Sequence, residues 1–220
     1  MSIRKGEPWG SPEDSAPDLV VTGDDHDLAT AVAGSPPGVL VSFVAAPGSD
    51  VARAVGLRSG APHQGLALPM DALELGDGRL AVNAVVLGPP PDRLHAFDAA
   101  AAISLDLDGA DGRGDAMQGT TVVVATGQWL RGVDLVPRGH PGDGRAEVQV
   151  YRLRRSERRA MRRRLPTGAH LPHPRITTRT AVAIEVRTGR PLRLEVDGRS
   201  ADRVATLRAV IAPARYRLLI

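Results

Sequence analysis

The chain has 220 residues and a mass of 23.2 kDa, which suits one ordinary domain or two small ones that share a core. It contains no cysteine, which excludes disulfide bonds, thiolate nucleophiles and cysteine-ligated metal centres. Aromatic residues make up 3% of the chain, so the core must consist mainly of aliphatic side chains. Neither a run of 18 apolar residues nor an apolar signal segment is present, so we expect a cytoplasmic protein.

The net charge of +3 conceals two halves of opposite sign. Residues 1–120 contain 7 Lys and Arg against 17 Asp and Glu, which gives a net charge of −10. Residues 121–220 contain 21 against 8, which gives +13. Lys5 is the single lysine, and it lies in a polar segment, so a lysine is not expected to hold a phosphate or form a Schiff base.

Residues 1–18 are rich in proline, glycine and acidic residues, and we expect a loose tail there. Over residues 19–65, two apolar strands alternate with two short helices. The expected elements are residues 19–21, 27–33, 39–45 and 49–55. Strands and helices that alternate with short links predict a small parallel α/β lobe.

From residue 66 the pattern changes to short apolar strands separated by Gly-Asp turns, which is typical of an antiparallel sandwich or barrel. The expected strands are residues 66–75, 80–87, 102–108, 120–126, 145–153, 180–187, 191–196, 206–211 and 214–219. An arginine-rich helix at residues 154–165 interrupts them. The predicted fold class is therefore α/β plus β, with a small α/β nucleotide-binding-like lobe followed by a β-sandwich lobe over residues 66–220.

Eight arginines lie within residues 152–164, against one acid, Glu157. A helix there would place four of them on one face, namely Arg155, Arg158, Arg159 and Arg162. A solvated face is the simplest interpretation, but this density suits an anionic membrane surface or lipid. Nucleic acid is the less favoured partner, because few aromatic side chains other than Tyr151 could stack on bases.

Two turns invite a functional interpretation beside a structural one. Residues 48–50 (Gly-Ser-Asp) open a helix after a buried strand, where free N–H groups could hold a phosphate, or where Ser49 simply caps the helix. Asp197-Gly198 is the commonest pair for a type I′ hairpin turn. The glycine patterns of dinucleotide-binding and phosphate-binding loops do not occur in the chain.

Several segments resemble, in the same order, the bacterial diacylglycerol kinase family of lipid kinases. Residues 20–28 (VVTGDDHDL) stand where that family has a strand followed by Gly-Gly-Asp-Gly-Thr. The other similar segments are residues 47–56 (PGSDVARAVG), 80–87 (LAVNAVVL), 122–137 (VVVATGQWLRGVDLVP), 142–148 (GDGRAEV) and 196–198 (VDG). The resemblance covers residues 19–220.

This resemblance implies a nucleotide lobe and a sandwich lobe with the site in the cleft between them. The implied activity is ATP-dependent phosphorylation of a lipid hydroxyl at the inner membrane face, with Asp197 as general base. The implied nucleotide-binding residues are Gly23, Asp24, Gly48, Ser49, Asp50 and Arg53, and Asp24 would also recruit Mg²⁺. A homodimer through paired sheet edges stays open.

The departures from the family pattern fall on the chemistry. Thr22, Asp25 and His26 stand where the family has Gly, Gly and Thr, and Asp25 brings a negative charge toward the phosphates. Arg199 replaces the glutamate that follows Asp-Gly, and no asparagine precedes Asp50. We therefore expect a divergent, N-terminally truncated relative of these kinases whose activity is reduced or lost. The alternative is a non-enzymatic module that keeps the fold and binds a lipid, a nucleotide or a protein partner.

Overall fold

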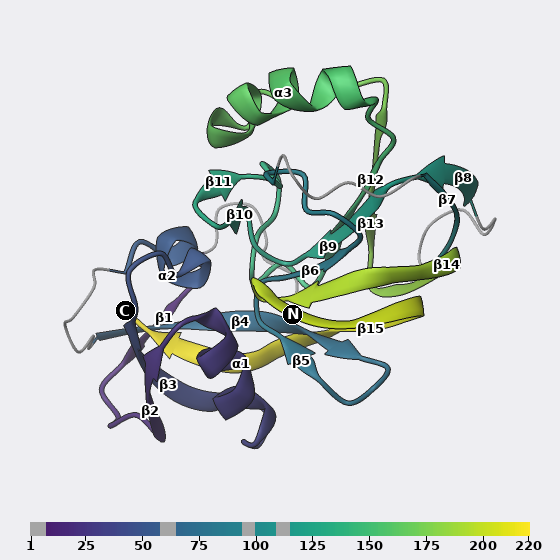
Figure 1. Cartoon of the computed structure of the whole chain (residues 1–220). Helices are drawn as coiled ribbons and strands as arrows, with labels where there is room; N and C mark the ends of the chain where they lie inside the picture. The colour runs from purple at the N-terminus through teal and green to yellow at the C-terminus, as the bar shows by residue number, and fades with distance from the viewer. Residues whose placement is uncertain (1–7, 58–64, 94–99, 109–114) are drawn as a thin grey trace.

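The computed structural model describes residues 8–57, 65–93, 100–108 and 115–220 (Figure 1). The helices are α1 (Asp25–Ala33), α2 (Asp50–Val55), α3 (Arg155–Arg164) and the short 3₁₀ helix η1 (Leu165–Thr167). The strands are β1 (Ser11–Glu13), β2 (Leu19–Gly23), β3 (Val39–Ala45), β4 (Gly65–Leu75), β5 (Leu80–Ala81), β6 (Ala84–Leu87), β7 (Ala101–Asp108), β8 (Asp115–Gly119), β9 (Thr121–Ala125), β10 (Trp129–Leu130), β11 (Val133–Asp134), β12 (Ala146–Tyr151), β13 (Ile176–Ala181), β14 (Ala183–Val196) and β15 (Arg199–Leu219). The expectation of a mostly β protein with a small N-terminal lobe is confirmed.

The first lobe is built around parallel strands. β2 pairs in parallel with β3, and β3 pairs in parallel with the C-terminal end of β15. The sheet continues from β15 to β4 and then to β1, each antiparallel to its neighbour. The core is largely aliphatic, and Leu28 and Val32 of α1 pack into it together with Phe43 and Tyr216.

The second lobe is an antiparallel sandwich whose two layers are joined by β14. β14 pairs with β15 from its first residues to its last; its first part also pairs with β7, and its last residues also pair with β6. From β6, the other layer runs through β9 and β12 to β13. Inward-facing aliphatic side chains such as Val85, Val124, Val148 and Val186 fill the space between the layers, as the alternating pattern predicts.

β15 runs through both lobes. It pairs with β14 along its first half, with β4 along its second half and with β3 near its end. A β-bulge between Ala212 and Tyr216, with Ala214 at a φ of 47°, bends the strand. Residues 206–211 and 214–219 are therefore one bent strand rather than two, and β4 and β15 complete the sheet of the first lobe as well as the second.

The segment before β2 is held against the first lobe. Ser11–Glu13 pairs with β4, the indole N–H of Trp9 donates a hydrogen bond to Pro69 O (3.2 Å), and Glu13 forms an ion pair with Arg217 (2.6 Å). For residues 8–18 the expectation of a loose tail is therefore wrong. Residues 1–7 lie outside the described residues.

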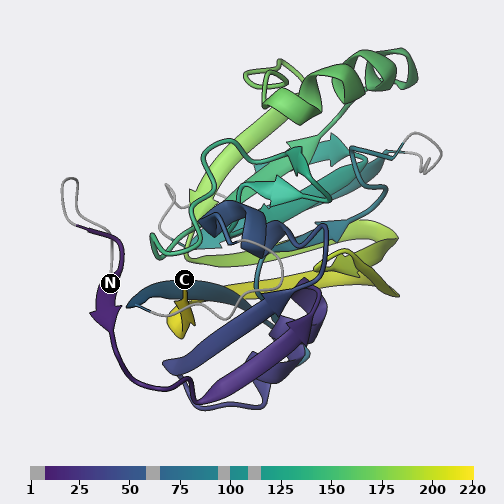
Figure 2. The same ribbon diagram turned by 90° about the vertical axis from the view of Figure 1, so that its left-hand side faces the viewer.

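α3 lies at the end of the molecule opposite α1, along the edge of the sandwich (Figures 1 and 2). Its inward side carries Arg158, Met161 and, just beyond it, Leu165, all buried. The prediction that Arg158 belongs to an exposed stripe is wrong, because this side chain faces the protein. The side chain of Arg155 lies outside the described residues. The exposed arginines of the helix are Arg159, Arg162, Arg163 and Arg164. Among the described helices, none has the length and apolar character needed to span a bilayer.

Asp71 of β4 is a buried acid that holds two irregular backbone segments. Its Oδ1 accepts a hydrogen bond from Ala214 N (2.8 Å) and its Oδ2 accepts one from Gly144 N (2.6 Å). Burial nevertheless raises the pKa of Asp71 above its usual value. The bulge of β15 and the loop before β12 therefore share one carboxylate.

Replacing Asp71 with alanine is expected to lower the free energy of unfolding by about 2–4 kcal/mol, because two backbone N–H groups would lose their acceptor at roughly 1–3 kcal/mol each. Urea denaturation at pH 7 measures the change. The matched control is Asp77→Ala, which removes an exposed carboxylate paired with Arg79 and should cost less than about 1 kcal/mol. Equal losses for the two variants would contradict the role of Asp71.

Candidate functional site

The turn between β2 and α1 holds the first predicted site residues. Asp24 is the N-cap of α1, and its carboxylate accepts hydrogen bonds from the N–H groups of His26 (3.0 Å) and Asp27 (3.1 Å). The Asp27 carboxylate in turn accepts from Asp24 N (2.9 Å), which completes a capping box. Gly23 has a φ of 144°, and a Cβ there would lie 2.1 Å from the Asp27 carboxylate. Gly23 and Asp24 therefore serve the start of the helix.

Arg199, at the start of β15, joins this turn to the second lobe. Its guanidinium donates to Asp24 (2.9 Å) and lies 3.4 Å from Asp27. Partial burial would raise the pKa of Asp24, but the Arg199 guanidinium and the helix N–H groups hold it below its usual value. Both side chains of the pair are about half exposed, so solvent screens the pair and it contributes little to stability.

Asp25 reaches across to the N-terminus of α2. Its carboxylate accepts hydrogen bonds from Ser49 Oγ (2.5 Å), Asp50 N (2.9 Å) and Val51 N (3.3 Å). The residue is 6% exposed, and burial, with the charge of Asp50 adding to it, raises its pKa to about 6 against the effect of these bonds. The N–H groups that open α2, which have no partner inside the helix, are therefore occupied by a carboxylate of the chain itself.

Asp50 and Arg53 connect α2 to the β10–β11 hairpin. The Asp50 carboxylate accepts hydrogen bonds from Arg131 N (2.5 Å) and Gly132 N (2.8 Å), at the tip of the hairpin. The Arg53 guanidinium lies 5.1 Å from the ring centroid of Trp129, a cation–π contact. Gly48 precedes the helix at a φ of 93°, with open space where a side chain would stand.

Asp197 forms the turn between β14 and β15. It and Gly198 have φ values of 46° and 79°, consistent with the expected type I′ turn. Its carboxylate accepts hydrogen bonds from Val82 N (2.9 Å), Asn83 N (3.0 Å) and Ala84 N (3.0 Å), in the break between β5 and β6. Burial, with the charge of Asp25 as a smaller contribution, raises the pKa of Asp197 to about 7.

These segments meet between the two lobes. The charge of Asp25 contributes to the raised pKa of Asp197, and the charges of both acids contribute to the raised pKa of Tyr216. The buried hydroxyl of Tyr216 has no hydrogen-bond partner among the described residues. Arg199 binds Asp24 at the same junction. The structure thus brings the acids of the β2–α1 turn, the start of α2 and the Asp197 turn to one place.

The fold and this junction can be set beside known proteins. Residues 92–220 match the model of the YegS C-terminal NAD kinase beta sandwich-like domain. The chain belongs to this family. No curated protein sequence matches it significantly.

Three solved structures are similar to this member of the NAD kinase beta sandwich-like family. A diacylglycerol kinase from Bacillus anthracis strain Sterne superposes with a TM-score of 0.71 at 15% identity, over 92% of this chain and 76% of that one. A second structure from that strain, provisionally described as a diacylglycerol kinase, gives the same TM-score and identity over 92% and 78%. An NAD kinase from Archaeoglobus fulgidus in complex with ATP gives 0.49 at 14% identity, over 92% and 78%. The first two likenesses show a shared fold.

The sequence resemblance to lipid kinases implies that this junction holds a nucleotide with Mg²⁺. The residues present do not fit it. Asp25 takes the donors at the start of α2, and Asp24 already accepts two N–H groups and a guanidinium. Within the described ranges, no group of three or more acidic or histidine side chains is placed to hold a metal ion. The roles predicted for Gly23, Asp24, Gly48, Ser49, Asp50, Arg53 and Asp197 stay predictions.

A cluster of charged side chains around Arg131 was not predicted from the sequence. The Arg131 guanidinium donates to Asp92 (2.8 Å) and pairs with Glu195, while its backbone N–H binds Asp50. Glu195 is 2% exposed. In the sequence Glu195 occupies a polar position of an alternating strand, which predicts solvent exposure, so the pattern carries no signal for this contact.

The stability of the protein is expected to fall as the pH rises from 5 to 7.5. The folded-state pKa values of Asp25 and Asp197 are raised to about 6 and about 7, so the folded chain keeps protons that the unfolded chain releases near pH 4. His170, whose pKa burial lowers, opposes this trend below its usual value of about 6.5.

A comparison with Asp25→Asn isolates the contribution of Asp25 from those of Asp197 and His170. Urea denaturation between pH 5 and 7.5 should show that the wild type loses about 1 kcal/mol of stability relative to this variant, since one pKa unit corresponds to about 1.4 kcal/mol. A difference that stays constant with pH would contradict the raised pKa of Asp25.

Proposed function

We propose that this protein is a diacylglycerol kinase-like binding protein that does not transfer phosphate. The observation that carries the proposal is the position of the Asp25 carboxylate on Ser49 Oγ and on the first N–H groups of α2. In the lipid kinases that the sequence resembles, a glycine stands in place of Asp25. A nucleotide phosphate would have to displace a carboxylate that already holds these donors.

The local charge supports the same conclusion. Asp24, Asp25 and Asp27 all lie in the turn that would approach the phosphates. Arg199 is the cation beside them, and it is already engaged with Asp24 and Asp27. Two unit charges 4 Å apart interact by about 4 kcal/mol at an effective dielectric constant of 20, so uncompensated acids here oppose a polyanionic ligand strongly.

An active lipid kinase is the second candidate, and the pKa of Asp197 favours it. A pKa of about 7 suits a general base that takes a proton from a lipid hydroxyl near neutral pH. Against this, the Asp197 carboxylate accepts hydrogen bonds from Val82, Asn83 and Ala84 and is 8% exposed. Such a carboxylate has a structural task to give up before it can act as a base.

The replacement Asp25→Gly tests whether the Asp25 carboxylate closes the site, that is, whether it keeps a nucleotide phosphate from the N–H groups at the start of α2. The wild type should give no Mg·ATP-dependent phosphorylation of diacylglycerol in mixed micelles. By calorimetry, the variant should bind a non-hydrolysable ATP analogue at least about tenfold more tightly than the wild type, because it frees the donors of α2 and removes a charge; a tenfold change corresponds to about 1.4 kcal/mol.

Asp14→Gly is the matched control, since it makes the same charge change at an exposed position and should leave nucleotide binding unaltered. Phosphorylation by the wild type that is lost in Asp197→Asn would establish the second candidate instead. Micromolar binding of Mg·ATP by the wild type would also contradict the closed site.

The binding role that we propose includes an anionic membrane surface. The exposed arginines defined above, Arg159, Arg162, Arg163 and Arg164, belong to α3, and α3 lies at the end of the molecule opposite α1 of the acidic first lobe (Figure 1). Basic side chains near an anionic surface contribute about 1 kcal/mol each at low ionic strength. In this proposal the protein is peripheral at the inner membrane face.

Vesicle co-sedimentation measures this binding. The triple replacement Arg159, Arg162 and Arg163→Gln should reduce binding to vesicles with 30% phosphatidylserine, a composition chosen for the assay, by about a hundredfold at low salt. The control replaces Arg187, Arg193 and Arg208, which are exposed on β14 and β15, with glutamine and has the same net charge. Equal loss in both variants would show that total charge, and not α3, determines binding.

A further inference from the structure

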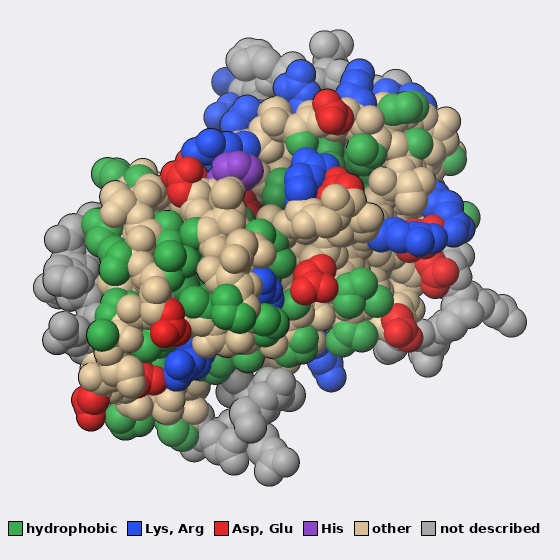
Figure 3. Space-filling model, turned by 90° about the horizontal axis from the view of Figure 1, so that it is seen from below, with side chains coloured by type: hydrophobic (Ala, Val, Ile, Leu, Met, Phe, Trp, Pro, Cys, Tyr) green, Lys and Arg blue, Asp and Glu red, His purple; other side chains and the backbone are tan. Residues whose placement is uncertain are grey.

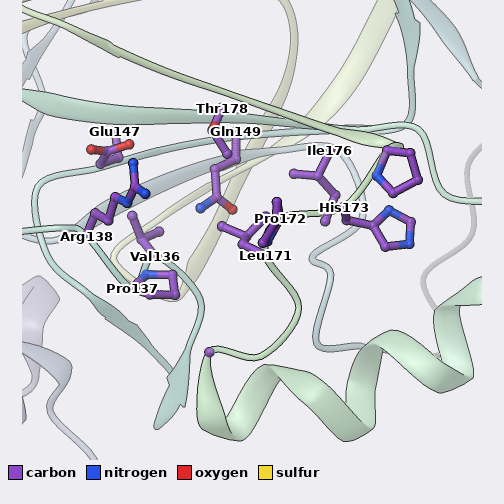
Figure 4. Close-up of a pocket in the computed structure, with 12 residues that line it drawn as sticks. Val136, Pro137, Arg138, Glu147, Gln149, Leu171, Pro172, His173, Ile176 and Thr178 are labelled. Carbon is purple, nitrogen blue, oxygen red and sulfur yellow. The ribbon is translucent and has the colours of Figure 1, made fainter.

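A pocket of about 580 Å³ lies beside α3, away from the Asp25–Asp197 junction (Figure 4). Its walls come from the loop at residues 136–138, from β12 and β13, and from the loop at residues 168–174. The volume falls within the range of about 300–1,000 Å³ typical of small-ligand sites. No residue predicted from the sequence to bind nucleotide lines it.

The two ends of the pocket differ in chemistry. Arg138 and Glu147 lie together at one end, and Leu171, Pro172 and Ile176 lie at the other, with Gln149 and Thr178 between them (Figure 4). Val136 and Pro137 border the charged end, and His173 lies beyond Ile176 at the other (Figure 4). A space that combines two charged groups with largely apolar walls suits an amphipathic molecule.

Strand register shows which end lies nearer the Asp197 turn. Ala84, whose N–H binds Asp197, pairs with Ala125, and Ala125 pairs with Glu147. Glu147 is therefore two strands, or about 10 Å, from Ala84. Ile176 pairs with Tyr151, at the far end of β12. The charged end of the pocket thus lies toward the junction of the lobes, and the apolar end points away from it.

The two charged side chains at the charged end of the pocket do not form an ion pair with one another. The Arg138 side chain is exposed, and within the described part of the chain neither its guanidinium nor the Glu147 carboxylate forms a side-chain hydrogen bond or an ion pair. Glu147 is half-buried, and its burial raises the pKa of the carboxyl, with the charge of Asp143 adding and that of Arg138 opposing. A partly buried carboxylate without a hydrogen-bonded partner costs stability, and a cationic group that binds it directly recovers part of that cost.

We infer that this pocket binds a single-chain zwitterionic amphiphile. Its head group lies between Arg138 and Glu147, with the anionic part at the guanidinium and the ammonium part at the carboxylate. Its chain packs against Leu171, Pro172 and Ile176. The inference goes beyond the proposed function and holds whether or not phosphate transfer is lost, since no pocket residue belongs to the Asp25–Asp197 junction.

The test uses three probes with the same ten-carbon chain: decylphosphocholine, decylamine and decyl sulfate. Calorimetry of the full chain with each probe, below its micelle concentration, should show the zwitterion binding about tenfold more tightly than either singly charged probe, the equivalent of about one good charge contact. Glu147→Gln should then shift the preference toward decyl sulfate, and Arg138→Gln should shift it toward decylamine.

Glu74→Gln and Arg145→Gln are matched controls at exposed positions and should leave the order of affinities unchanged. Thermal denaturation of each variant verifies that it is folded. Equal binding of the three probes, no saturable binding by a folded wild type, or the same response to Glu147→Gln and Arg138→Gln would each overturn the inference. Phosphorylation assays do not enter this test, so its failure is distinguishable from failure of the proposed function.

Discussion

A buried carboxylate that accepts backbone N–H groups from a second segment is the interaction on which both lobes depend. Asp25 does this for the start of α2, Asp71 for the bulge of β15, and Asp197 for the break between β5 and β6. Irregular backbone leaves N–H groups without a ladder partner, and such groups are costly when buried. In a chain rich in turns and poor in aromatic side chains, these acids fix the loops that a large core would otherwise hold.

The same contacts limit what the junction of the lobes can do. A helix N-terminus can hold either a phosphate or a carboxylate, because both compete for the same N–H groups. In this chain Asp25 takes that place, and its partner Ser49 caps the helix at the same time. The arrangement that stabilises the α1–α2 contact is therefore the arrangement that opposes a nucleotide.

Local patterns determined how much could be predicted from the sequence. Aliphatic runs such as residues 39–45 and the Asp197-Gly198 pair indicate their structure because strand alternation and turn geometry act over a few residues. The acceptor role of Asp197 could not be predicted, since Val82 lies 115 residues away. β1 and the continuity of β15 were missed for the same reason: proline-rich or bent strands form when a distant edge supplies partners.

Basic and acidic side chains are distributed unevenly between the two ends of the molecule. Seen from below, basic side chains are most numerous toward the upper margin, and acidic and basic side chains are interspersed over the rest of this face (Figure 3). α3 and α1 lie at opposite ends, so in this proposal an anionic surface that attracts α3 would have the acidic first lobe on the side away from it (Figure 2). The pocket borders the loop that follows α3 and η1, through Gly168 and Leu171. An amphiphile that leaves such a surface would therefore meet the apolar end of the pocket before the junction of the lobes.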